Sequence, residues 1–255
     1  MAREPLWRGV AVALVTLFDA DGAVDVPATA THAARLVDLG MRAVLVAGST
    51  GEAEALTDSE RLALVTAVRQ ACPGVPVIAG VSGPWAAPVA DLVAASVAAG
   101  ADAVLVAPPR RVGDLVGFYR IVHQAAGAAP VLAYHYPGVA GAAVPVEALP
   151  ELAVDGLKDS TGDPERLLRT LEAWSGWTYV GSSTVVSYAG QVGATGAILA
   201  VANAVPEECV AAFDGDGTAQ RRLTGPHLAA RRDFPHGLKE LVSRRFGTAT
   251  GCRLG

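Results

Sequence analysis

Eight apolar segments of strand length recur along this chain, separated by segments with helical periodicity. The apolar segments are rich in Val, Ile, Leu and Ala, which is typical of parallel strands buried on both faces. We expect strands at Gly9–Leu17, Arg42–Ala47, Val75–Val81, Ala101–Ala107, Pro130–Tyr136, Asp155–Asp159, Thr178–Ser182 and Ala194–Val201. We expect helices at Pro27–Leu39, Ser59–Ala71, Pro88–Ala99, Asp114–Ala126, Val146–Ala153, Pro164–Ser175 and Thr184–Val192. Eight βα units in one domain predict an α/β fold, the (β/α)8 TIM barrel.

Local signals support two of the helix starts. Thr57-Asp58-Ser59-Glu60 has the character of a capping box, and Asp163-Pro164 places a proline at a first helical position. We expect residues 1–205 to form the barrel core. Residues 206–255 should add the last barrel helix and a short C-terminal helical extension of up to two helices, within the same domain.

Composition excludes several classes of protein. With 51% hydrophobic residues in 255, the chain can bury one large core. A formal net charge of −5 and the absence of any Lys/Arg run longer than two residues argue against a nucleic-acid partner. The first eight residues lack a leader pattern, and no apolar run reaches the roughly 18 residues of a membrane span. Three scattered cysteines suit neither a disulfide framework nor a zinc site, so we expect a cytoplasmic protein without a metal.

Lysine is rare in this chain: Lys158 and Lys239 stand against eighteen arginines. Arginine stays protonated at any working pH, whereas a desolvated lysine can lose its proton and attack a carbonyl carbon. Lys158 lies near the C-terminal end of the sixth expected strand, the end at which barrel enzymes place their chemistry. Either lysine could instead be a surface or salt-bridged residue, and the polar helical context of Lys239 fits that interpretation. For Lys158 we favour a Schiff-base nucleophile.

Other polar residues fall at the same end of the expected barrel. Tyr134 is on the neighbouring fifth strand, where its phenol could shuttle the protons that imine formation requires. The turn Gly48-Ser49-Thr50-Gly51 offers two hydroxyls and free backbone N–H groups, which suit a carboxylate. Together these residues predict a 2-oxo acid site. Each also has a structural alternative: an ordinary turn, a strand aromatic, or, for Ser182 after the seventh strand, a helix N-cap.

These segments resemble the dihydrodipicolinate synthase/N-acetylneuraminate lyase family, class I aldolases that form a Schiff base with pyruvate. The segment 48–52 matches the family's Gly-[Thr/Ser]-Thr-Gly-Glu signature, 134–137 matches Tyr-x-x-Pro, and 156–160 matches the motif of the Schiff-base lysine. The resemblance covers nearly the whole chain. It implies catalytic roles for Lys158 as the imine-forming residue, Tyr134 as the acid/base and Ser49 as the proton relay. The residues that it implies or suggests for substrate binding are Thr50, Gly51, Val139, Ser182 and Arg110.

Two departures from the family pattern concern the substrate. The family's fourth-strand loop usually contains Pro-Tyr-Tyr, and Arg110 stands here in place of the second tyrosine. In true dihydrodipicolinate synthases an arginine two residues after Tyr-x-x-Pro grips the carboxylate of the second substrate, and this chain has Val139 there. An apolar side chain cannot replace a bidentate guanidinium. Arg110 is either an interface or solvent arginine, or it supplies the charge that Val139 does not.

The chain therefore looks closer to the sugar-acid aldolases of the family, with a shortened C-terminal extension. The leading hypothesis is an aldolase or lyase that makes or cleaves a carbon–carbon bond to pyruvate, on a 2-oxo-3-deoxy sugar acid or a 4-hydroxy-2-oxo acid. The imine would be the electron sink, so no cofactor is expected. The alternatives are dihydrodipicolinate synthase acting on pyruvate and aspartate semialdehyde, a dehydratase using the same imine, and a 2-oxo acid-binding homologue without turnover. An unrelated phosphate-binding barrel is a further alternative, which the low glycine content of residues 181–183 disfavours. The expected partners are pyruvate, an aldehyde and further copies of the chain, as a dimer or tetramer.

Overall fold

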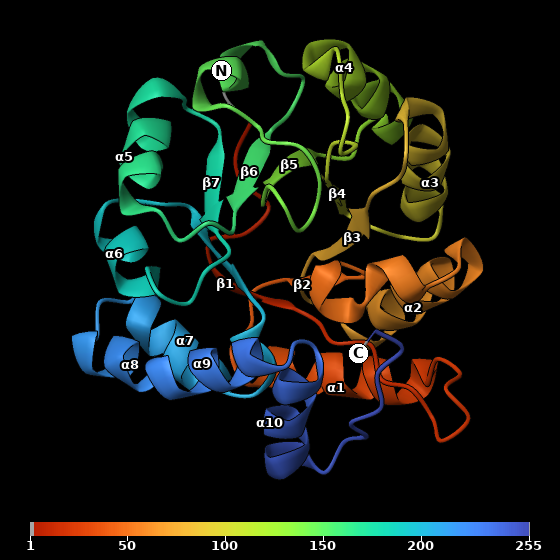
Figure 1. The fold of residues 1–255 in the computed structure, drawn as a ribbon, viewed down its shortest axis with the longest axis vertical. Helices are drawn as coiled ribbons and strands as arrows, with labels where there is room; N and C mark the ends of the chain where they lie inside the picture. The colour runs from red at the N-terminus through yellow and green to blue at the C-terminus, as the bar shows by residue number, and fades with distance from the viewer. Residues whose placement is uncertain (1–2, 255) are drawn as a thin grey trace.

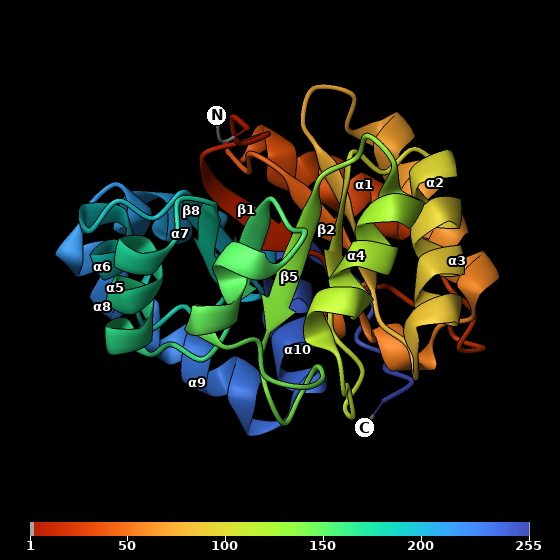
Figure 2. The same cartoon turned by 90° about the horizontal axis from the view of Figure 1, so that it is seen from above.

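The computed structural model describes residues 3–254 and shows a closed barrel of parallel strands inside a ring of helices (Figures 1 and 2). Each strand pairs with the next in sequence, and β8 closes the barrel against β1. The strands are β1 (Gly9–Ala13), β2 (Val44–Val46), β3 (Val77–Val81), β4 (Ala103–Val106), β5 (Val131–His135), β6 (Gly156–Asp159), β7 (Trp177–Val180) and β8 (Gly196–Leu199). The first six helices are α1 (Val26–Asp38), α2 (Asp58–Ala71), α3 (Ala86–Ala98), α4 (Leu115–Ala126), α5 (Pro164–Ala173) and α6 (Val186–Gln191). The predicted TIM barrel is confirmed.

The two predicted helix starts are also confirmed. The Thr57 hydroxyl accepts the Glu60 backbone N–H (3.2 Å), and a Glu60 carboxylate oxygen accepts the Thr57 N–H (2.8 Å), which completes a capping box for α2. Asp163 caps α5 by accepting the N–H groups of Glu165 and Arg166, with proline at the first helical position. These local contacts fix where α2 and α5 begin, and therefore where the loops that precede these two helices end.

Several elements differ from the prediction. β1 ends at Ala13 because backbone N–H groups beyond it donate to side chains instead of to a neighbouring strand. The Val15 N–H donates to the Asn203 side chain, and the Leu17 N–H donates to the Thr29 hydroxyl. The segment expected to be an α-helix at 146–153 is the 3-10 helix η3 (Val146–Glu151). It contains Pro150, which has no N–H for an α-helical hydrogen bond.

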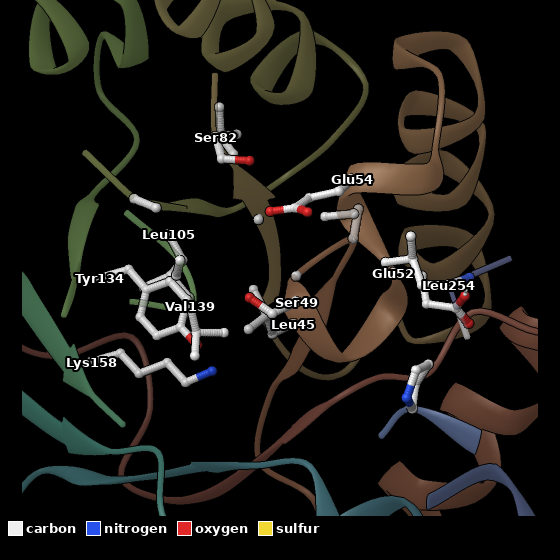
Figure 3. Close-up of a pocket in the computed structure, with 18 of the residues that line it drawn as sticks. Leu45, Ser49, Glu52, Glu54, Ser82, Leu105, Tyr134, Val139, Lys158 and Leu254 are labelled. Atoms are coloured by element: carbon white, nitrogen blue, oxygen red, sulfur yellow. Dashed lines mark hydrogen bonds between the residues drawn. The ribbon is translucent and has the colours of Figure 1, made fainter. Parts of the chain in front are cut away.

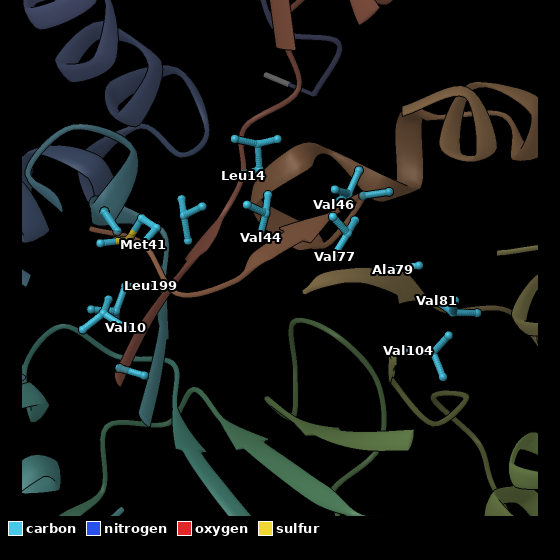
Figure 4. Packing of buried hydrophobic residues seen from close by; sticks show 14 of the residues in the cluster. Val10, Leu14, Met41, Val44, Val46, Val77, Ala79, Val81, Val104 and Leu199 are labelled. Atoms are coloured by element: carbon cyan, nitrogen blue, oxygen red, sulfur yellow. The ribbon is translucent and has the colours of Figure 1, made fainter. Parts of the chain in front are cut away.

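Side chains alternate along the strands between two apolar layers. Inward residues such as Leu45, Leu105 and Leu132 fill the barrel. Outward residues pack beneath the helices, and Figure 4 shows part of this layer around β1, β2 and β3. At the amino end of the strands the Trp7 and Tyr179 rings stack with centroids 4.4 Å apart. This packing fills the amino end of the barrel.

Beyond β8 the chain forms α7 (Pro206–Phe213), α8 (Gly217–Arg222), α9 (Thr224–Arg232) and α10 (His236–Phe246). Three helices thus follow α7, one more than the sequence led us to expect. After α10 the chain turns back, and its end lies against the segment before α1 and the first turn of α2. Arg253 fixes this end by donating to the carbonyls of Gly22 and Ala55 and pairing with Glu60 (2.7 Å). Within residues 3–254, none of the helices has the length and apolar character needed to cross a membrane.

Candidate active site

Lys158 projects into the barrel from β6. Its Cα is in register with those of Tyr134 on β5 and Tyr179 on β7, and its side chain is only 4% exposed. Gly181, just after β7, leaves room for the lysine: a Cβ there would lie 3.0 Å from Lys158 Cε and would overlap the Ser160 hydroxyl. Any larger residue at position 181 would therefore displace the amine.

Burial sets the charge state of this amine. It lowers the pKa of Lys158 from 10.5 to about 7, because an ammonium loses hydration inside the barrel. The Nζ atom lies 4.7 Å from the centroid of the Tyr134 ring. The adjacent Asp159 carboxylate is paired with Arg166 (2.5 Å). A large fraction of Lys158 is therefore neutral near pH 7, the form that attacks a carbonyl carbon.

Tyr134 stands next to the amine and remains a phenol at neutral pH. Burial raises the pKa of Tyr134, and hydrogen bonding to the side chains of Ser160 and Ser49 partly opposes that increase. Figure 3 shows the Tyr134 and Lys158 side chains lying together in the cavity, with Ser49 nearby. The three predicted catalytic residues thus line one cavity of about 350 Å³.

The Gly-Ser-Thr-Gly-Glu segment forms a tight turn at the cavity. Ser49–Gly51 is a 3-10 helix (η1), with Gly48 and Ser49 among the lining residues. Thr50 and Gly51 are buried and lie outside that set of lining residues. The turn is close-packed, since a Cβ on Gly51 would lie 3.0 Å from both the Leu14 carbonyl oxygen and the Thr16 hydroxyl. Carboxylate binding by Thr50 and Gly51 stays a prediction.

Glu52, the last residue of this segment, is a buried carboxylate that joins the turn to the C-terminal tail. One oxygen accepts from Nζ of Lys239 on α10 (2.6 Å), and both side chains are fully buried. The other oxygen accepts the backbone N–H groups of Arg253 (2.7 Å) and Leu254 (2.8 Å). Lys239 is therefore salt-bridged on a helix, as its sequence context indicates, but it is not at the surface. Its ammonium also donates to the Gly251 carbonyl (2.6 Å).

Three apolar side chains from distant parts of the chain line the same cavity. Val139 follows β5, Phe234 precedes α10, and Leu254 belongs to the tail; they are 45%, 45% and 38% exposed. We call these three residues the apolar mouth. Arg110 also lines the cavity, and its guanidinium lies 3.8 Å from the Glu54 carboxylate. The opening of the cavity is thus lined by the apolar mouth and by one solvated ion pair, Arg110 with Glu54.

Some predicted and observed positions do not coincide. Ser182 is outside the lining residues described for the cavity, and its hydroxyl bonds instead to that of Thr184 (2.8 Å) just before α6. Sequence reasoning missed Phe234 and Leu254, because neither lies in a βα loop and no local pattern places the tail at the cavity. It also gave no role to Glu52, although this residue is part of the recognised segment.

Comparisons with known proteins identify the family. The dihydrodipicolinate synthetase family model matches residues 6–218. An uncharacterized DapA-like lyase of Halobacterium salinarum is 37% identical over 81% of this chain and 71% of its own length. A protein of Emericella nidulans, named a probable mitochondrial 4-hydroxy-2-oxoglutarate aldolase, is 34% identical over 82% and 74%. A prophage protein of this family from E. coli K12, solved in complex with pyruvate, superposes with a TM-score of 0.86 at 25% identity, over 97% and 92% of the two chains. The chain thus belongs to the dihydrodipicolinate synthetase family and is a lyase of the class I aldolase type.

Proposed function

We propose that this enzyme joins pyruvate to an aldehyde and cleaves the resulting 4-hydroxy-2-oxo acid, the 2-oxo-3-deoxy sugar acids being the polyhydroxylated members of that class. The observation that carries the proposal is the desolvated Lys158 amine beside Tyr134 and Ser49 in one cavity. The solved relative with bound pyruvate and the relative named as a 4-hydroxy-2-oxoglutarate aldolase support it.

The proposed cleavage begins when neutral Lys158 attacks C2 of the substrate. Loss of water from the carbinolamine gives a protonated imine, with Tyr134 moving the proton and Ser49 relaying it. Tyr134, which has given its proton to the departing water, then takes the proton of the 4-hydroxyl. The C3–C4 bond breaks and its electron pair passes to the iminium, leaving an enamine and a free aldehyde. Protonation of the enamine at C3 and addition of water release pyruvate and regenerate the amine. The imine is the electron sink, so the scheme requires no cofactor.

The other end of the substrate should lie at the Ser49–Gly51 turn. Thr50 and the backbone N–H groups of this turn are proposed to bind the 2-oxo acid carboxylate. Val139 gives the cavity no guanidinium for a second carboxylate, and Arg110 is already beside Glu54. These two positions disfavour aspartate semialdehyde as the aldehyde.

Borohydride trapping combined with turnover tests the proposed function. Incubation with pyruvate and sodium borohydride should fix one pyruvate on the chain, and peptide mass analysis should locate it at Lys158. Pyruvate release from 4-hydroxy-2-oxo acids, followed with lactate dehydrogenase, should show turnover. Trapping at Lys239, or none, would contradict the imine assignment. Trapping at Lys158 without turnover on any such acid would favour a 2-oxo acid-binding homologue instead.

Tyr134→Phe should retain pyruvate trapping but lower kcat by roughly 10²-fold or more, the usual effect of losing a positioned acid/base. The phenyl ring preserves packing against Lys158 and removes only the proton carrier. Tyr136→Phe is a matched control, because this tyrosine is two residues away on the same segment and lies outside the set of lining residues. A near-normal kcat in Tyr134→Phe would assign the proton transfers to another group.

A further inference from the structure

Exposed apolar side chains gather where this enzyme would receive its aldehyde. Seven large hydrophobic side chains are exposed within residues 3–254, and three of them, Val139, Phe234 and Leu254, line the cavity that contains Lys158. Because they come from three separate segments, the fold itself brings them together. An apolar surface beside a reactive amine indicates which part of a substrate it would contact.

The polar groups at this mouth are poorly suited to a hydroxyl-rich chain. The Arg110 and Glu54 side chains are 65% and 68% exposed, so water solvates both. Their charged groups lie 3.8 Å apart and partly neutralise each other. Ala53, Ala140 and Pro235 add further apolar lining. Beyond the residues next to Lys158, Ser82 and this solvated ion pair are the side chains that could bond to a polyhydroxylated aldehyde, so such an aldehyde would lose more hydration at the apolar surface than these groups restore.

Leu254 is held in place by the protein. Its backbone N–H donates to the buried Glu52 carboxylate (2.8 Å), and the preceding Arg253 is bound to Glu60 and two backbone carbonyls. These contacts fix the backbone at position 254, which limits where the Leu254 side chain can lie and reduces the entropy lost on binding a ligand there.

We propose that the aldehyde carries an apolar substituent, an alkyl chain or an aryl ring, which packs against Val139, Phe234 and Leu254. The inference rests on the proposed function and narrows it: C4-alkyl or C4-aryl 4-hydroxy-2-oxo acids are the substrates, in preference to sugar acids. Val139, Phe234 and Leu254 are then specificity residues, and Lys158 performs the same carbon–carbon chemistry on every acceptor.

The first test measures aldol addition of pyruvate to propanal, butanal, pentanal, hexanal and benzaldehyde, with glyceraldehyde and glyoxylate as hydroxylated and acidic comparators. In the alkyl series kcat/KM should rise about twofold to fourfold per methylene, the gain from burying one CH₂. Hexanal and benzaldehyde should exceed both comparators by at least about tenfold. A flat alkyl series, or preference for glyceraldehyde or glyoxylate, would overturn the inference.

The second test removes the surface. Phe234→Ala and Leu254→Ala should each lower kcat/KM for hexanal by about fivefold to twentyfold and change that for glyceraldehyde by less than about twofold. Leu228→Ala is the matched control, because Leu228 is 59% exposed on α9 and lies outside the lining residues. Equal losses on both aldehydes, or a change in oligomer size by light scattering, would assign these side chains to structure or subunit contact and overturn the inference.

Pyruvate trapping, measured in the wild type and in every variant, separates the proposed aldolase function from the proposed preference for apolar aldehydes. Absence of trapping in the wild type would overturn both. Trapping and turnover that remain intact, without any apolar preference, would overturn this inference alone.

Discussion

Lys158→Met should abolish aldol turnover, with kcat lower by about 10⁴-fold or more, and should eliminate borohydride trapping of pyruvate. The methionine side chain is unbranched and one heavy atom shorter than lysine, so it fills most of the same space, but it cannot form an imine. Lys239 cannot take over, because its ammonium is held by Glu52 and the Gly251 carbonyl. The measurements are pyruvate release and intact mass after reduction. Residual trapping in the variant would place the imine elsewhere.

The pH dependence gives this prediction a second readout. With a pKa of about 7, the neutral fraction of Lys158 falls about tenfold per pH unit below 7, and imine formation should fall with it. The folded pKa lies below the ordinary 10.5, so between about pH 7 and 10.5 the unfolded chain binds more protons at this site and the free energy of unfolding rises with pH. Urea unfolding at pH 7 and pH 9 should therefore show a larger increase for the wild type than for Lys158→Met.

Lys239→Met should lower the free energy of unfolding by about 3–5 kcal/mol, because it leaves the Glu52 carboxylate buried without its counter-charge. Urea unfolding with circular dichroism measures this effect. Arg244→Met on the same helix is the control: its pair with Glu240 is exposed and should be worth less than about 1 kcal/mol.

A double variant makes the test of this pair sharper. Glu52→Gln combined with Lys239→Met removes both charges, so it should cost clearly less than the sum of the two single changes. Additive losses, or a loss below about 1 kcal/mol for Lys239→Met, would show that the pair contributes little. The hydrogen bonds of Glu52 to the tail would then have to form without help from the Lys239 charge.

The barrel and the centre of the site were predictable because their signals are local. A strand of this fold needs only a short apolar run, and a capping box needs four consecutive residues, as Thr57 to Glu60 show. Neighbouring strands then place Tyr134 beside Lys158 without further information. The prediction failed at 146–151, where Pro150 prevents an α-helix that the apolar spacing alone suggested.

The outer part of the site depends on contacts between residues far apart in the sequence. Glu52 binds the N–H groups of Arg253 and Leu254 across about two hundred residues, and no periodicity encodes such a contact. The rarity of lysine pointed to a special role for Lys158 alone, and no signal in the sequence indicated that Lys239 would be buried. Each proved to be buried, Lys158 as a desolvated amine and Lys239 as an ion pair.

The way in which Glu52 holds the tail bears on how acceptor preference could diversify in this chain. The carboxylate binds the main-chain N–H of residue 254, a group that every amino acid except proline possesses. The side chain at 254 can therefore change while its backbone stays anchored, and the change need not disturb the strand that carries Lys158. The backbone of residue 254 is thus anchored whatever its side chain. A library of substitutions confined to this residue should vary the aldehyde that is accepted and leave imine formation at Lys158 unchanged.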